Sequence, residues 1–175
     1  MTQSEAIERF LAALRQWGAR TNLVGSLDVD ALTRHVEDSL AAAEHLPRSA
    51  RVVDLGSGAG FPGIPLAIAR PDLDLTLVEI RERRVHFLRH VVRRLALGCR
   101  IERRRIEEPL APLFEFALLR AVAPPEGSFL LARPWLRELG EVWIWAGPAV
   151  AIGPGTGSIA LASGGRILKR VREAL

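Results

Sequence analysis

The sequence has little of what marks an extracellular, metal-binding or membrane protein. Of its 175 residues one is a cysteine, Cys99, and none is a tyrosine. A single thiol excludes an internal disulfide and a cysteine-cluster zinc site, and it is typical of a reducing compartment. No apolar run approaches the ~18 residues of a membrane span, and the first residues do not resemble a secretion signal. We therefore expect a cytoplasmic protein that contacts no membrane.

The composition is that of an ordinary globular protein. Hydrophobic residues make up 49% of the chain and charged residues 25%, which argues against disorder. The length fits about one domain, whose core buries roughly 70% of the unfolded chain's surface. We expect a monomer and one compact structural unit. In it residues 1–48 form a helical extension packed on a core of residues 49–175.

The basic residues are concentrated in one segment. Lys169 is the single lysine, so 23 of the 24 basic residues are arginine. Nucleotide-composition bias accounts for this ratio of arginine to lysine but not for the distribution of the arginines along the chain. Residues 81–105 contain ten arginines against Glu82 and Glu102, a local charge of +8, whereas the whole chain carries +4. A one-sided basic segment indicates a polyanionic partner such as RNA.

Hydrophobic periodicity predicts two helices, over 4–17 and 29–46, before any strand. Strands and helices then alternate. The predicted strands are 51–55, 73–79, 100–103, 116–119 and 141–145, with helices over 62–70, 82–97 and 127–138. Two further strands, 158–162 and 166–171, form a terminal hairpin. This order is typical of an α/β fold with a mostly parallel sheet, helices on both faces and an antiparallel C-terminal edge.

The strongest motif is the glycine-rich turn after the first strand, which runs Asp54-Leu55-Gly56-Ser57-Gly58-Ala59-Gly60-Phe61-Pro62-Gly63. Alternate glycines let the chain turn sharply and let a ligand lie against bare backbone. The same stretch contains a formal dinucleotide fingerprint, but the spacing fails when it is counted from Gly56, the first glycine after the strand. Asp54 would repel a pyrophosphate and attract the cations of S-adenosylmethionine. Glu79, after the second strand, can accept the ribose hydroxyls of either cofactor.

The stretch from Asp54 to Leu66 resembles the cofactor loop of the glucose-inhibited division protein B family, whose members are small-subunit ribosomal RNA guanine-N7 methyltransferases. Further matches are Thr21-Asn22-Leu23, Arg34-His35-x-x-Asp38-Ser39-Leu40, Arg83-Arg84-Val85-x-Phe87-Leu88 and Arg120-Ala121. The resemblance covers roughly residues 5–147, with a weaker match at Arg166. It implies a Rossmann-like sheet with N-terminal helices, S-adenosylmethionine as cofactor, and ribosomal RNA or the small ribosomal subunit as partner. The implied reaction is methyl transfer to N7 of a guanine in 16S ribosomal RNA.

The resemblance also implies roles for individual residues. The glycines of the loop line the methionine end of the cofactor, Glu79 takes the ribose, and the turn at Arg105-Ile106-Glu107 frames the adenine. Arg120 faces the transfer site, where His35 and Asp38 are further catalytic candidates. The candidate cofactor-binding residues are Asp54, Gly56, Ser57, Gly58, Gly60, Phe61, Glu79, Arg84, Ile106, Glu107 and Arg120. The chain departs from the family at Trp145-Ala146-Gly147, where a lysine usually precedes the glycine.

Guanine N7 carries a lone pair and no proton, so its methylation needs alignment rather than a general base. Arg120 is suited to donate to guanine O6, a phosphate or the cofactor carboxylate. The predicted helix over 82–97 turns Arg83, Arg89, Arg93 and Arg94 away from its apolar side, where they either contact phosphates or are merely solvated.

Arg84 falls inside the apolar stripe of the same helix. There it either pairs with a carboxylate near the pocket or extends its charged end to solvent. His86 and His90 have no third ligand nearby, so we expect no metal.

Two alternatives remain open on the sequence alone. A non-catalytic RNA-binding or regulatory relative of the methyltransferase fold is favoured by the missing lysine and a C-terminal region that looks short. An NAD-type nucleotide-cofactor enzyme is the second alternative, because the turn contains a formal dinucleotide fingerprint and Glu79 fits that cofactor class as well.

Overall fold

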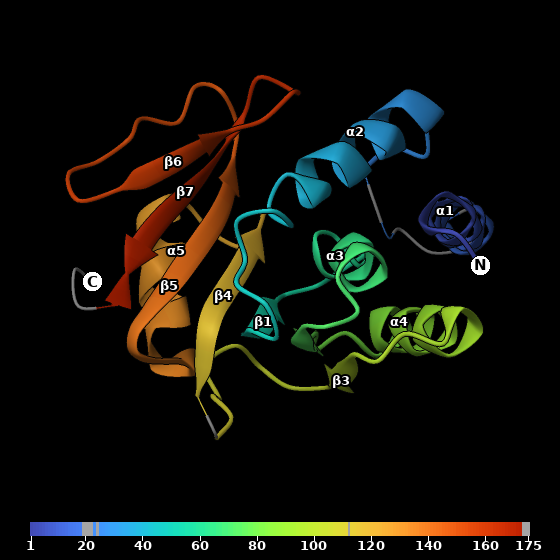
Figure 1. Ribbon diagram of the computed structural model, residues 1–175, viewed down its shortest axis with the longest axis horizontal. Helices are drawn as coiled ribbons and strands as arrows, with labels where there is room; N and C mark the ends of the chain where they lie inside the picture. The colour runs from blue at the N-terminus through green and yellow to red at the C-terminus, as the bar shows by residue number, and fades with distance from the viewer. Residues whose placement is uncertain (19–22, 24, 112, 173–175) are drawn as a thin grey trace.

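The computed structural model describes residues 1–18, 23, 25–111 and 113–172. Its centre is a seven-stranded sheet of order β3-β2-β1-β4-β5-β7-β6 (Figure 1). The strands are β1 (Arg51–Leu55), β2 (Asp74–Val78), β3 (Arg100–Glu102), β4 (Phe114–Arg120), β5 (Leu136–Ala146), β6 (Gly157–Ala160) and β7 (Arg166–Val171). Strands β1 to β5 pair in parallel, and β7 is antiparallel to both β5 and β6. The predicted sheet, with its antiparallel C-terminal edge, is confirmed.

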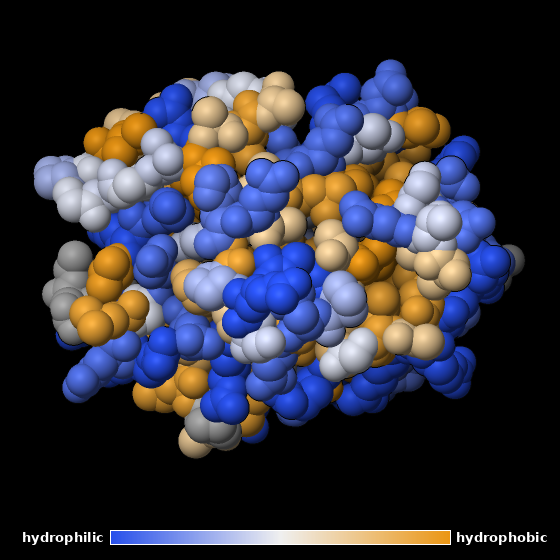
Figure 2. All heavy atoms as spheres, in the orientation of Figure 1, coloured by the Kyte–Doolittle hydropathy of each residue, from blue (hydrophilic) through white to orange (hydrophobic). Residues whose placement is uncertain are grey.

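Helices cover both faces of this sheet. One face carries α1 (Gln3–Gly18), α2 (Val29–Leu40), α3 (Gly63–Ala69) and α4 (Glu82–Leu95), with α3 lying between α2 and α4 (Figure 1). The other face carries α5 (Pro125–Ala132) and a 3-10 turn, η1 (Arg133–Trp135). Within the described ranges, no helix is long and apolar enough to cross a bilayer. Figure 2 shows hydrophobic side chains gathered over α3 on the visible face.

Neighbouring residues of each central strand belong to different hydrophobic cores, because successive side chains of a strand point to opposite faces. Val52 and Leu118 pack under α3 and α4, whereas Val53 and Leu119 pack against α5 and η1. All four side chains are fully buried. Each such burial contributes roughly 1.5–3 kcal/mol. The near-continuous apolar runs of β1 and β4 therefore follow from burial on two sides.

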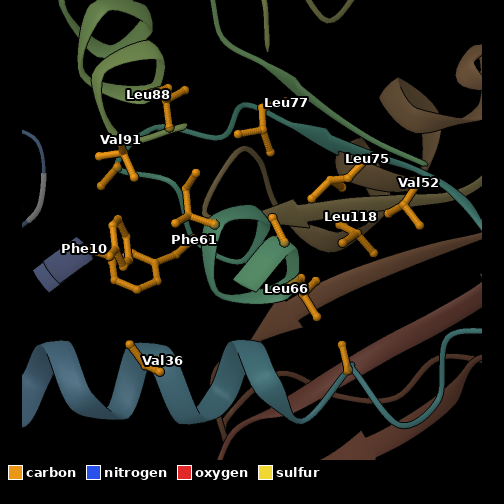
Figure 3. Packing of buried hydrophobic residues seen from close by; sticks show 14 of the residues in the cluster. Phe10, Val36, Val52, Phe61, Leu66, Leu75, Leu77, Leu88, Val91 and Leu118 are labelled. Carbon is orange, nitrogen blue, oxygen red and sulfur yellow. The ribbon is translucent and has the colours of Figure 1, made fainter. Parts of the chain in front are cut away.

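The N-terminal helices support the glycine turn through aromatic contacts. Phe61, within the turn, packs edge-on against Phe10 of α1 with ring centroids 5.2 Å apart. Phe10 also lies 6.5 Å from the ring of Phe87 on α4. Val36 of α2 belongs to the same cluster (Figure 3). Residues far apart in sequence thus hold the turn from one side.

The helix predicted over 29–46 ends early, at Leu40. The carbonyl of Asp38, which would accept from residue 42 in a continued α-helix, accepts from Trp145 Nε1 at 2.7 Å. The Ser39 hydroxyl donates to the His35 carbonyl at 2.6 Å, a competing bond that disfavours a regular helix. Residues 41–45 continue as tight turns, with Ala42 N donating to Ser39 O. A contact to β5 that no local pattern reveals therefore stops this helix.

The helix predicted over 127–138 is also wrong in its second half. Pro134 has no N–H to donate and restricts the residue before it, so the α-helix ends at Ala132 and η1 follows. Strand β5 then begins at Leu136, five residues before the predicted start. The strand pairs with β4 across a register irregularity near Phe114 and Phe116. Helix propensity around 136–138 is overridden by this pairing.

Candidate functional site

The turn after β1 is built on glycines that a side chain would strain. Gly56, Gly58 and Gly60 have φ values of +74°, +56° and +94°, a region that other L-residues rarely adopt. The amides of Gly56 and Ser57 both donate to Val78 O, at 2.9 and 3.0 Å, and tie the turn to the end of β2. A Cβ on Gly60 would lie 2.6 Å from Ile64 of α3. The predicted close backbone turn is confirmed.

Glu79 lies directly beneath this turn and is 5% exposed. Its Oε2 accepts from the Gly58 amide at 3.1 Å, and its Oε1 accepts from the Arg81 amide at 2.7 Å. Arg84 Nη1 lies 3.7 Å from Oε2, an ion pair consistent with the position of Arg84 in the apolar stripe of α4. A carboxylate has about four acceptor sites. Glu79 therefore keeps acceptor capacity beyond these backbone donors, and a contact with ligand hydroxyls stays a prediction.

Asp54 supports the turn from inside. It is 1% exposed, and its Oδ2 accepts from the Gly63 amide at 3.2 Å. Its Oδ1 has no hydrogen-bond partner among the described residues. Burial raises the pKa of Asp54 to about 7. The carboxylate thus lies beneath the turn, and a direct contact with the cofactor stays a prediction.

A pocket of about 230 Å³ opens beside the turn. Its wall combines residues from the segment before α2, α2 itself, the glycine turn, α4 and the end of β4. They are Leu23, Gly25, His35, Gly56, Ser57, Gly58, Ala59, Phe61, Arg84, Arg120 and Ala121. Seven of these are candidates named from the sequence: His35, Gly56, Ser57, Gly58, Phe61, Arg84 and Arg120. The fold therefore brings together candidates that lie far apart in the sequence.

Arg120 occupies the centre of the site. Its Nη2 lies 2.5 Å from His35 Nδ1, and its Nη1 donates to the His35 carbonyl at 3.4 Å. Its guanidinium carbon is 5.9 Å from the ring centroid of Phe61. Burial lowers the pKa of His35, and the charge of Arg120 lowers it further. Burial also lowers the pKa of Arg120, although a guanidinium remains charged at neutral pH. A neutral His35 thus accepts at Nδ1 and holds the arginine in place.

A second pocket, of about 400 Å³, lies on the other side of Arg120. Its lining comes from α2, the ends of β4 and β5, the start of α5 and the loops around the C-terminal hairpin. The residues are Asp38, Arg120, Ala121, Ala123, Pro125, Ile144, Trp145, Ala146, Gly147, Pro148, Val150, Leu161, Ser163 and Gly165. Arg120 and Ala121 line both pockets. Ala146, where the family usually has lysine, contributes no cation here.

Sequence reasoning missed the contribution of Trp145 and the hairpin to this pocket. The available signal was topological: parallel strands bring their carboxyl ends to one edge of a sheet, where ligands bind. That rule indicates the ends of β4 and β5. It does not indicate the loops around the hairpin.

Other predicted residues lie around these two pockets. Ile106 is half-buried, and its Cδ1 is 3.5 Å from where a Cβ on Gly56 would be, whereas Glu107 is exposed. Thr21 and Asn22 lie outside the described residues. In the part of the chain that the structure describes, no cluster of three histidine, cysteine or acidic residues could hold a metal ion.

The four arginines predicted to face solvent on α4 do so: Arg83, Arg89, Arg93 and Arg94 are all exposed. None of these four side chains has an ion-pair or hydrogen-bond partner among the described residues. Other arginines of the basic segment are engaged, since Arg100 pairs with Asp74 at 2.6 Å and Arg103 with Glu82 at 3.4 Å. The four exposed arginines form one face of α4, and we call them the α4 arginine face.

The strand order, the glycine turn after β1 and the buried acid after β2 define a Rossmann-like methyltransferase fold. Solved structures agree. The chain is similar to a T. thermophilus 16S rRNA N2 G1207 methyltransferase in complex with AdoMet and guanosine, with a TM-score of 0.62 and 20% identity over 85% of this chain and 44% of that one. It is also similar to a mutant of MtNAS in complex with S-adenosylmethionine, with a TM-score of 0.62 and 18% identity over 97% of this chain and 71% of that one.

Sequence comparison identifies the family. The model of the rRNA small subunit methyltransferase G family matches residues 3–152, so the chain belongs to that family. A ribosomal RNA small subunit methyltransferase G of Gluconobacter oxydans is 42% identical over 78% of this chain and 70% of the relative. One of Mycolicibacterium paratuberculosis is 42% identical over 77% of this chain and 56% of the relative. The chain thus matches between about half and 70% of the length of these relatives. Membership removes the NAD-type alternative.

Proposed function

We propose that this chain binds S-adenosylmethionine in the 230 Å³ pocket and transfers its methyl group to N7 of a guanine in 16S ribosomal RNA. The guanine occupies the 400 Å³ pocket. The observation that carries this proposal is the shared wall: Arg120 and Ala121 line both pockets. Methyl transfer needs two ligands that meet at one boundary. The relatives' name supports ribosomal RNA as substrate, and N7 rests on the resemblance described above.

The residues beside the glycine turn fit the cofactor. The bare backbone of Gly56 and Gly58 admits a ligand into close contact, and their positive φ values keep side chains out of these positions. Glu79 offers acceptors to the ribose hydroxyls, and Ile106 offers apolar surface beside Gly56. The negative charges of Glu79 and Asp38 favour a cationic ligand nearby. When bound, S-adenosylmethionine supplies the methyl group.

The side chains at the shared wall position the base. Guanine N7 needs no proton removed, so no residue has to act as a general base. Arg120 donates to O6, the acceptor beside N7, and leaves the N7 lone pair free. His35, neutral because its pKa is lowered, fixes the guanidinium. The work of these residues is alignment, which can supply much of a methyltransferase's rate enhancement.

The α4 arginine face provides contacts for the RNA backbone. Its side chains are exposed and have no acidic partner among the described residues, so binding a phosphate breaks no internal ion pair. Phosphate contacts position a nucleic acid without reading its sequence. We propose that the chain acts as a monomer in the cytoplasm, where its RNA partner is found.

The test is a methylation assay with radiolabelled S-adenosylmethionine and small-subunit RNA from a strain that lacks the modification, followed by mapping of the methylated base. We expect 7-methylguanine. A methyl group on an exocyclic amine, a pyrimidine carbon or a ribose hydroxyl would contradict N7 transfer. Tight S-adenosylhomocysteine binding without transfer to any RNA would favour the non-catalytic alternative, for which Ala146 in the pocket wall is the specific observation.

A further inference from the structure

Asp38 is a buried acid with an oxygen that nothing in the described protein satisfies. The residue is 7% exposed and lines the 400 Å³ pocket. Its Oδ1 has no hydrogen-bond partner among the described residues. Its Oδ2 lies 4.0 Å from Arg120 Nη2, which is beyond hydrogen-bond distance. The ion pair with Arg120 partly compensates the charge, but a buried oxygen without a hydrogen-bond donor is costly. The arrangement therefore indicates that a ligand supplies the donor.

The backbone around Asp38 is fixed in this position. The Asp38 carbonyl accepts from the indole Nε1 of Trp145 at 2.7 Å, and Trp145 lines the same pocket. On the next residue, the Ser39 hydroxyl donates to the His35 carbonyl at 2.6 Å. These bonds connect α2 to β5 and to the residue that holds Arg120. Asp38 and Arg120 are thus presented together, an acceptor beside a donor.

Guanine is the base whose edge matches this pair. A carboxylate accepts two parallel donors, and guanine presents N1–H and the 2-amino group side by side with O6 next to them. Adenine presents one donor group and an acceptor at N1, which a carboxylate repels. Cytosine also offers a single donor group, and uracil offers one N–H flanked by acceptors. With O6 on Arg120, the N7 edge faces the wall shared with the cofactor pocket.

We propose that Asp38 selects guanine by accepting hydrogen bonds from N1–H and the 2-amino group while Arg120 donates to O6. This inference rests on the proposed function, because it places a guanine in the 400 Å³ pocket. It assigns Asp38 a role in recognition, in contact with the base and distinct from proton transfer.

The test compares GMP with IMP, which lacks only the 2-amino group, as ligands in the presence of S-adenosylhomocysteine. We expect the wild-type protein to bind GMP roughly 10- to 150-fold more tightly, the equivalent of one hydrogen bond to a charged group. Asp38→Asn, whose amide opposes the 2-amino group, should bring this ratio close to one. The control Glu37→Gln removes the same charge from the exposed neighbouring residue and should keep the wild-type ratio.

Equal affinity of the wild-type protein for GMP and IMP, or no binding of either, would overturn the proposal without any variant. An unchanged GMP-to-IMP ratio in Asp38→Asn, in protein that still binds S-adenosylhomocysteine, would also overturn it. Failure of the proposed function has a different signature. In that case wild-type protein would prefer GMP, and the preference would vanish in Asp38→Asn, yet no methyl group would reach RNA.

Discussion

Asp54 makes the stability of the molecule depend on pH. Burial raises its pKa from 3.8 to about 7, so the folded state holds a proton that the unfolded state releases between these values. The contribution of protonated Asp54 to the free energy of unfolding is therefore complete below about pH 4, and it is lost as the pH rises to about 7. The loss corresponds to about 4 kcal/mol. Denaturant unfolding of the ligand-free protein at several pH values should show this fall. The fall should be absent in Asp54→Asn and unchanged in Asp30→Asn, an exposed control.

Arg120 is expected to affect turnover more than cofactor affinity. Its guanidinium is held by His35 at the boundary of both pockets, so its loss mainly misplaces the base. Arg120→Ala should lower kcat by on the order of 10²-fold, the usual effect of removing a positioned donor. The affinity for S-adenosylhomocysteine, measured by calorimetry, should change much less. Arg120→Lys keeps the positive charge but loses the planar, forked donors of the guanidinium, so its kcat should lie between those of the wild type and Arg120→Ala. If the affinity for S-adenosylhomocysteine fell more than kcat, the result would indicate that Arg120 contacts the cofactor rather than the base.

At the same scale, the sequence pattern predicted the residues of the glycine turn but not the contacts that connect the other side of the site. The turn is local: its glycines and Glu79 follow strand ends that the sequence pattern predicts. The contact between Asp38 and Trp145 joins positions 107 apart, and no pattern along the chain connects them. Arg120, His35 and Asp38 were named by resemblance. Their mutual distances depend on how α2 crosses the ends of β4 and β5.

Helix α4 ends in a conformation that its sequence does not favour. The apolar stripe predicts a helix through residue 97, but Ala96 adopts φ +52° and Leu97 N donates to Val92 O at 3.0 Å. This is a Schellman ending, whose left-handed position usually holds glycine. Ala96→Gly should raise the free energy of unfolding by about 1 kcal/mol, because a left-handed alanine costs roughly 1–2 kcal/mol. Thermal unfolding measures the gain. The control Ala12→Gly, in the middle of α1, should destabilise by about 1 kcal/mol.

The α4 arginine face should account for the salt dependence of RNA binding. Replacing Arg89 and Arg93 with Glu should weaken binding, and each lost phosphate contact should lower the slope of log affinity against log salt by up to about 0.9 on duplex RNA. Filter binding at several salt concentrations measures the slope. Arg48→Glu with Arg133→Glu makes the same charge change at two exposed sites outside α4. An equal loss in that control, or an unchanged slope, would mean that the face is only solvated.

Periodicity was a good guide to α4 because the helix is amphipathic and packs on one side only. It predicted an apolar side, where Val85, Leu88 and Val91 are buried, as well as the exposed arginines. It was a poor guide to α2 and to the segment after α5, where tertiary contacts and Pro134 set the ends. Faces of elements follow from local sequence, whereas several of their ends do not.

At the scale of the whole molecule, the N-terminal helices share one core with the sheet. Phe10, Leu14 and Leu32 are at most 1% exposed, and they belong to the same cluster as Phe87 and Leu118. The division at residue 48 therefore separates two regions of the chain but cuts through a hydrophobic core. We propose that residues 1–48 are an extension that the rest of the chain requires for folding.

Removal of residues 1–48 tests this arrangement. Each of the three side chains contributes roughly 1.5–3 kcal/mol by burial, and their combined loss is comparable to the roughly 5–15 kcal/mol stability of a typical domain. The fragment 49–175 should therefore show no cooperative thermal transition and no binding of S-adenosylhomocysteine, measured by calorimetry. The point variant Phe10→Ala, which should cost about 3–5 kcal/mol, is the graded control: it should unfold cooperatively at a lower temperature. A fragment 49–175 that unfolds cooperatively and binds the ligand would instead make the helical extension a separable domain.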